Sequence, residues 1–177
     1  MIKPREGILR IQSSLALVLF LAVASSHASA VGWECNISED KMRGTKSESC
    51  EIFSKNTVAL PFPYQRKDNR LNLIIRTSGK TRDVILEIGA GQLTTDKSSL
   101  RLDEGFAAVK FGGGPVKNFR LQGSTSGHHN LGFIESSASF LKLIEKGGPA
   151  TIEVHFYQAG RKQFEFDLPP LPAASKK

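Results

Sequence analysis

The 177-residue chain has few cysteines and histidines, which limits the metal and redox chemistry open to it. A structural zinc site takes about four cysteine or histidine ligands, and no cluster of these residues is present. Fourteen residues separate Cys35 from Cys50, whereas a redox pair has the spacing Cys-x-x-Cys. One structural disulfide between Cys35 and Cys50, closing a loop of about 16 residues, is therefore favoured over a metal pair or a redox dithiol.

The sequence also lacks the short motifs of common enzyme classes. No Gly-x-Ser-x-Gly elbow marks a nucleophilic serine. Val84–Gly91 resembles the glycine-rich loop of Rossmann-like methyltransferases, but Leu93 stands at the third glycine position and no helix pattern follows. Gly112–Lys117 has no Gly-Lys-Ser/Thr and leads into a strand pattern, unlike a P-loop. We expect no enzyme activity, no cofactor and no catalytic residue.

Long apolar runs are missing after the first thirty residues. Within those thirty, three basic residues precede the apolar run Leu15–Ala24, and the small residues Ala28 and Ala30 suit a signal peptidase. This pattern predicts a signal peptide over 1–30, cleaved after Ala30. The alternative is an uncleaved anchor, but ten apolar residues make only about 15 Å of helix against a bilayer core of about 30 Å.

Export leads to an oxidising space in which a disulfide persists. The sequence therefore predicts a periplasmic or secreted protein of a Gram-negative bacterium, with no membrane span after cleavage. The net charge is +7, and the basic residues are scattered instead of forming a dense stripe. A nucleic-acid partner is not expected.

Most of the remaining sequence consists of short strand patterns separated by glycine-rich turns. This spacing predicts an antiparallel β-sandwich with one short helix in the C-terminal half. A single domain is expected over 31–168, followed by an extended, proline-rich tail over 169–177. The expected strands are Gly32–Cys35, Cys50–Ser54, Thr57–Phe62, Leu71–Arg76, Asp83–Ile88, Ser99–Asp103, Phe106–Phe111, Asn118–Gln122, Leu131–Glu135, Thr151–Gln158 and Lys162–Leu168.

The last two strands allow a more detailed prediction. A three-residue loop, Gln158–Gly160, would place Phe156 opposite Lys162 and put Gly160 where a left-handed residue is needed. The same register pairs Val154 with Phe164 and Ile152 with Phe166, all four on the core face. The expected helix starts at Ser136 or Ser137, ends at Gly147 or Gly148, and covers the core with Phe140, Leu141 and Ile144.

Two polar loops are the candidate contact surfaces, because glycine and serine leave backbone donors accessible and the neighbouring side chains add polar groups. A weaker alternative is a metal site of His155 with Glu153, Glu165 and Asp167. The candidate contact residues are Gly112, Gly113, Gly114 and Lys117 in the first loop, with Arg120 beyond it, and Ser126, Gly127, His128 and His129 in the second.

Short motifs spread along the chain resemble a known family. They are Trp33-Glu34-Cys35, the turn Asp40–Gly44, Cys50, and the closing Phe166-Asp167-Leu168. The chain is similar in these to the small exported β-sandwich proteins of proteobacteria grouped around invasion-associated locus B, and to related uncharacterised secreted proteins. The resemblance implies a non-enzymatic envelope protein and supplies no catalytic residues.

The sequence thus predicts a non-catalytic periplasmic or envelope-associated binding protein, whose partner is an envelope protein or surface ligand of undefined identity. One alternative is an inhibitor of a cell-wall-degrading enzyme such as lysozyme, which would insert Ser126-Gly127-His128 into a cleft. The other is an envelope enzyme, assisted by a metal.

Overall fold

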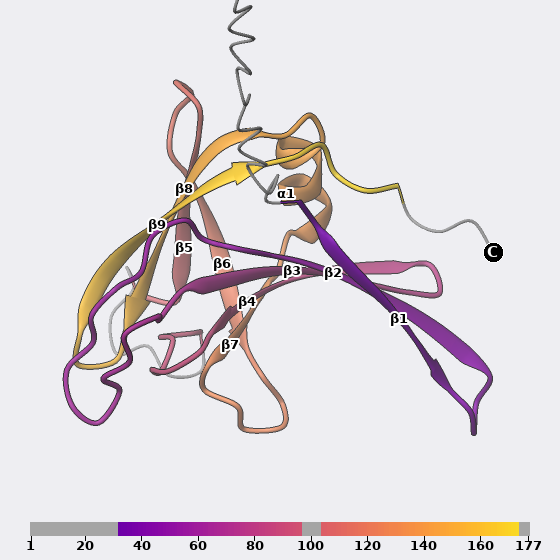
Figure 1. Ribbon diagram of the computed structural model, residues 1–177, viewed down its shortest axis with the longest axis horizontal. Coiled ribbons are helices and arrows are strands. Elements are labelled where there is room, and N and C mark those ends of the chain that lie inside the picture. Colours follow the sequence, from indigo (N-terminus) through magenta and orange to yellow (C-terminus); the bar gives the residue numbers. More distant parts are fainter. Residues whose placement is uncertain (1–31, 97–103, 174–177) are drawn as a thin grey trace, which may run out of the picture.

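The computed structural model describes residues 32–96 and 104–173, and that part of the chain forms nine strands and one helix (Figure 1). The strands pair antiparallel in the order β1-β2-β3-β4-β7-β6-β5-β8-β9. The elements are β1 (Glu34–Asp40), β2 (Thr45–Phe53), β3 (Leu71–Ser78), β4 (Thr81–Ile88), β5 (Phe106–Phe111), β6 (Lys117–Gly123), β7 (Leu131–Ile134), α1 (Ser137–Ile144), β8 (Gly148–Phe156) and β9 (Gly160–Leu168).

The predicted fold class, mostly antiparallel β with one short helix, is confirmed, and all nine strands belong to one continuous sheet. The sheet continues through β6, whose first half pairs with β5 and whose second half pairs with β7. Leu73 and Leu86 from one part of the sheet share a buried cluster with Ile152 and Phe164 from the other. Burial of this apolar surface between the two parts of the sheet is the main stabilising term of the fold.

The outer edge of β9 is covered by the segment that follows β2. The amide of Lys55 donates to the carbonyl of Glu165 at 2.7 Å. The side chain of Asn56 accepts from the amide of Glu165 at 2.7 Å and donates to the carbonyl of Gln163 at 2.9 Å. These bonds satisfy backbone groups that an edge strand would otherwise leave open for pairing with another chain.

The helix α1 covers the core as predicted. Phe140 and Ile144 are fully buried, and the Phe140 ring meets the Phe119 ring edge-on at 5.3 Å between centroids. Ser136 precedes the helix without a side-chain capping bond. The hydroxyl of Ser137 instead donates to the carbonyl of Ile134 at 2.7 Å and accepts from a β4 amide, which ties the helix start to the sheet.

The chain leaves the helix through Gly147, one of the two predicted end residues. Its φ of +71° lies in the left-handed region, and a Cβ there would stand 2.5 Å from the carbonyl oxygen of Leu168. Only glycine meets both demands without strain.

The predicted register of the last hairpin is wrong by two residues. Phe156 pairs with Gly160, Val154 with Lys162 and Ile152 with Phe164, so the three-residue loop runs from Tyr157 to Ala159. Both Gln158 (φ +59°) and Gly160 (φ +68°) adopt left-handed backbone conformations. The predicted core face is nevertheless correct, because a shift of two residues leaves every side chain on its own face of the strand.

Of three other predictions, one is wrong and two concern residues outside the described ranges. The strand predicted over Thr57–Phe62 is wrong: the segment is irregular, since Pro61 and Pro63 remove backbone donors, although Leu60 is still buried. The strand predicted over Ser99–Asp103 and the signal peptide over 1–30 lie outside the described residues.

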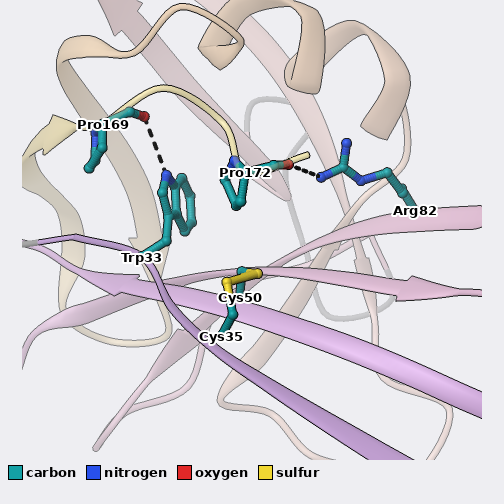
Figure 2. Close-up of a disulfide and its surroundings, with 6 residues drawn as sticks. All are labelled: Trp33, Cys35, Cys50, Arg82, Pro169 and Pro172. Carbon is teal, nitrogen blue, oxygen red and sulfur yellow. Dashed lines mark hydrogen bonds between the residues drawn. A yellow bond between two sulfur atoms is a disulfide. The ribbon is translucent and has the colours of Figure 1, made fainter. Parts of the chain in front are cut away.

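The β1–β2 hairpin extends away from the body of the sheet (Figure 1), and all of β1 is exposed or partly exposed. The predicted disulfide joins Cys35 to Cys50, which are directly opposed on these strands. In Figure 2 the indole of Trp33 stands beside this bridge and donates to the carbonyl of Pro169 at 3.3 Å.

The segment after β9 has no regular secondary structure through residue 173, and it lies against the protein. Arg82 donates to the carbonyl of Pro172 at 3.2 Å, and the amide of Leu171 donates to the carbonyl of Glu145 at 3.1 Å. Within the described residues, α1 is too short and too polar to cross a membrane.

Candidate functional site

The outward-facing surface of β5, β6, β8 and β9 carries a pocket of about 240 Å³. The sheet register places Asn118, Ala108 and Glu153 in one row across three neighbouring strands. The methyl side chain of Ala108 leaves a hollow between its two longer neighbours. We term this the outer pocket, and its lining residues are Phe106, Ala108, Asn118, Glu153, Val154, His155 and Arg161.

The outer pocket combines an apolar floor with polar walls. Phe106 and Ala108 are half-buried on β5. The guanidinium of Arg120 stacks over the Phe106 ring at 5.4 Å and lies 3.5 Å from a carboxylate oxygen of Glu135, which holds the ring in place. A small apolar hollow with a few converging polar groups is the usual form of a small-molecule site.

His155 is held in the wall of this pocket by the connection between β4 and β5. The amide of Thr94 donates to the His155 carbonyl at 2.8 Å, and the Thr94 hydroxyl lies 3.1 Å from His155 Nδ1. On the other side, His155 Nε2 is 3.7 Å from a carboxylate oxygen of Glu104. Two partners on opposite ring nitrogens fix the orientation of the imidazole.

This group of hydroxyl, imidazole and carboxylate has the composition of a catalytic triad but not its accessibility. Thr94 is only 3% exposed, so a substrate has little access to its hydroxyl. A nucleophile has to reach the reacting atom of the substrate. The arrangement therefore orients His155 and does not activate Thr94.

Opposite charges lie side by side in the outer pocket. Glu153 accepts a hydrogen bond from the side chain of Gln163 at 2.8 Å, and its other carboxylate oxygen is 3.8 Å from Arg161 Nη1. The Arg161 side chain is half exposed and that of Glu153 is more buried. The pocket thus offers a planar cation near its mouth and an anion deeper in its wall.

The alternative metal site around His155 is not formed. His155 pairs with Arg161, whereas Glu165 pairs with Thr151, four residues farther along β8 and so about 13 Å away. Asp167 binds Lys55 at 2.7 Å, and this hydrogen bond and charge raise the pKa of Lys55. The acidic residues expected around His155 are therefore spread along the hairpin.

The two predicted contact loops lie at opposite ends of β6. Gly112, Gly113 and Gly114 form a tight turn before Lys117, with the Gly114 amide donating to Phe111 at 2.9 Å. Ser126, Gly127, His128 and His129 follow the other end of the strand and are exposed. Seven residues of strand separate the loops by about 20 Å, so one small ligand cannot touch both.

A second hollow, on the outer face of β2, β3 and β4, contains a polar group that its neighbours leave unsatisfied. The side-chain amide of Asn72 donates to Glu51 at 2.6 Å, but its Oδ1 has no hydrogen-bond partner among the described residues. Asn72 lines the hollow but is only 3% exposed, and its Oδ1 is buried. The polar groups of the outer pocket are more accessible than Asn72 Oδ1.

Comparison with protein-family models, curated proteins and solved structures finds no match to this chain.

Sequence reasoning singled out His155 and Glu153 but missed Phe106, Ala108 and Arg161. The five residues lie on β5, β8 and β9, and only the pairing register of these strands brings them together. A polar residue on the outer face of a strand gives the same sequence pattern whether it binds a ligand or only contacts water. One signal was available: on its own face of β5, Ala108 is the small residue between Phe106 and Lys110.

Proposed function

We propose that this chain is a non-catalytic binding protein of the cell envelope, and that the outer pocket is its ligand site. The observation that carries the proposal is the hollow over Ala108, with the oriented His155, Glu153 and Arg161 around it. The buried position of Thr94 supports binding over nucleophilic catalysis. Exposure of the Ser126–His128 loop is common in proteins of any function and does not select an inhibitor of wall-degrading enzymes.

The chemistry of the pocket favours a ligand of the size and charge of an amino acid. Guanidinium groups bind carboxylates through two parallel N–H bonds, which makes Arg161 the partner of a ligand carboxylate. Glu153 would accept from a ligand ammonium group, and Phe106 and Ala108 would contact an apolar side chain. A volume of about 240 Å³ is small for a drug-sized ligand and suits such a compact zwitterion.

Titration calorimetry with L-leucine and L-leucinamide tests this function. We expect leucine to bind and leucinamide, which lacks the carboxylate, to bind at least tenfold more weakly. Ala108→Leu fills the hollow and should abolish binding. Its free energy of unfolding should change by no more than about 0.5 kcal/mol, because the residue is on the outer face.

Thr151→Leu is the matched control, since Thr151 lies on the same face of the neighbouring strand β8 but outside the outer pocket. It should bind leucine like the unmodified protein. Equal affinity for leucine and leucinamide, or full binding by Ala108→Leu, would show that the ligand site lies elsewhere.

The proposed envelope location rests on the leader pattern of residues 1–30 and agrees with the disulfide. We expect mass spectrometry of the protein recovered from a Gram-negative host to give an N-terminus at Val31. The mass should be two hydrogens below that of the reduced mature chain. Material that starts at Met1 and carries free thiols would contradict the export proposal, and with it the resemblance to the invasion-associated locus B family.

A further inference from the structure

A carboxylate side chain, that of Glu48, lies beside the disulfide. Cys35 and Cys50 oppose each other directly on β1 and β2, and Glu48, two residues before Cys50, shares the same strand face. The two sulfur atoms and a carboxylate oxygen of Glu48 all lie within 4.8 Å of one another. Within the residues described, no other three histidine, cysteine or acidic side chains converge in this way.

The strand pairing, and not only the disulfide, holds these residues together. Seven residue pairs align β1 with β2. The turn between the strands is fixed by Asp40, whose carboxylate accepts from the amide of Met42 at 2.9 Å and pairs with Arg43 at 2.8 Å. The hydrogen bond from Arg43 is the main cause that lowers the pKa of Asp40. Because the seven residue pairs and the turn do not depend on the S–S bond, we expect the cysteines to stay opposed when the bridge is opened.

We propose that reduction of the Cys35–Cys50 bridge creates a zinc site of two thiolates and the Glu48 carboxylate. A dithiol donor supplies two electrons and two protons, the S–S bond becomes two thiols, and the donor becomes a disulfide. Zn²⁺ then displaces the two thiol protons and binds Cys35 Sγ, Cys50 Sγ and a Glu48 oxygen. Water takes the fourth tetrahedral position.

In the oxidised protein the two sulfur atoms are bonded at 2.08 Å, and a carboxylate oxygen of Glu48 lies within 4.8 Å of both. Zinc lies about 2.3 Å from sulfur and about 2.1 Å from oxygen, so the sulfur atoms have to separate on reduction before both can bind one ion. Thiolate ligands select zinc over magnesium or calcium. Cys35 is exposed on the edge strand, which gives both reductant and metal a route to the site. This inference goes beyond the proposed ligand binding and does not involve the outer pocket.

The test uses the full protein reduced with a phosphine, freed of reductant without oxygen, and titrated with Co²⁺ and then Zn²⁺. We expect one equivalent of Co²⁺ to give the sulfur-to-metal charge-transfer band and the visible bands of a tetrahedral site, and Zn²⁺ to displace it. Trp33, the single tryptophan, lies beside the bridge (Figure 2), so its fluorescence should change on reduction and again on metal binding.

Variants measure the contribution of the carboxylate to zinc affinity separately from that of the thiolates. Groups that only support a ligand are worth roughly 10- to 100-fold in metal affinity, so Glu48→Gln should weaken Zn²⁺ binding at least tenfold. Glu39→Gln removes the same charge from the same hairpin about 13 Å along the strand from Cys35, and it should bind Zn²⁺ like the unmodified protein.

Three results would overturn the proposal. The first is that the reduced protein binds Zn²⁺ no more tightly than the Cys35→Ala/Cys50→Ala variant. The second is that Glu48→Gln binds Zn²⁺ with unchanged affinity. The third is that reduction abolishes the β circular dichroism, since the site requires a folded hairpin. None of these results affects leucine binding by the oxidised protein.

Discussion

Replacing Phe164 with alanine is expected to lower the free energy of unfolding by about 3–5 kcal/mol. Phe164 is fully buried on β9, opposite Ile152, and its ring centroid lies 6.2 Å from that of Phe156. Truncation removes apolar contacts and leaves a cavity, because β9 is held by its ladder to β8 and by the Lys55–Asn56 segment and relaxes only in part. Urea denaturation of the purified protein measures the loss.

Gln163→Ala is the control for this effect. Gln163 precedes Phe164 in the strand, and its exposed side chain donates a hydrogen bond to Glu153 at the surface. Its loss should change the free energy of unfolding by no more than about 0.5 kcal/mol. A neutral Phe164→Ala together with a costly Gln163→Ala would mean that the two faces of β9 are reversed.

Removing the disulfide is expected to cost about 3 kcal/mol, because the open chain no longer restricts a loop of about 16 residues in the unfolded state. The variant Cys35→Ala/Cys50→Ala avoids free thiols, and its urea midpoint relative to the oxidised protein gives the difference. A loss of this size leaves a domain of ordinary stability folded, as the proposed zinc site requires.

The hairpin offers a matched non-covalent pair as the control. Ser38 and Ser47 oppose each other on β1 and β2, and their hydroxyls hydrogen-bond at 2.7 Å on an exposed surface. Replacing both with alanine should cost less than about 1 kcal/mol. An equal loss for the two double variants would show that the disulfide contributes no more than an ordinary cross-strand pair.

Much of the fold could be predicted because the apolar pattern of each strand is decided locally. The alternation in β8 and β9 predicts the buried face, but it leaves the register open, since a shift by two residues buries the same side chains. The loop fixes the register, and its left-handed residue Gln158 is an uncommon choice for that conformation. Val58 and Leu60 imitate strand alternation, and the two neighbouring prolines prevent pairing.

The candidate site could be predicted only in part, because its residues come from segments far apart in the sequence. The sequence singles out His155 by its chemistry, and it cannot show that Thr94 and Glu104 orient the ring from a distant connection. The hollow depends on Ala108 having Asn118 on one side and Glu153 on the other. Such pairings between strands far apart in sequence follow from topology and not from local pattern.

The most direct test of the proposed binding function is a crystal structure of the protein grown with saturating L-leucine. We predict electron density for one leucine in the outer pocket, with its carboxylate on Arg161, its ammonium group near Glu153 and its side chain against Phe106 and Ala108. An outer pocket that holds no leucine under these conditions, or leucine bound only at another surface, would contradict the account.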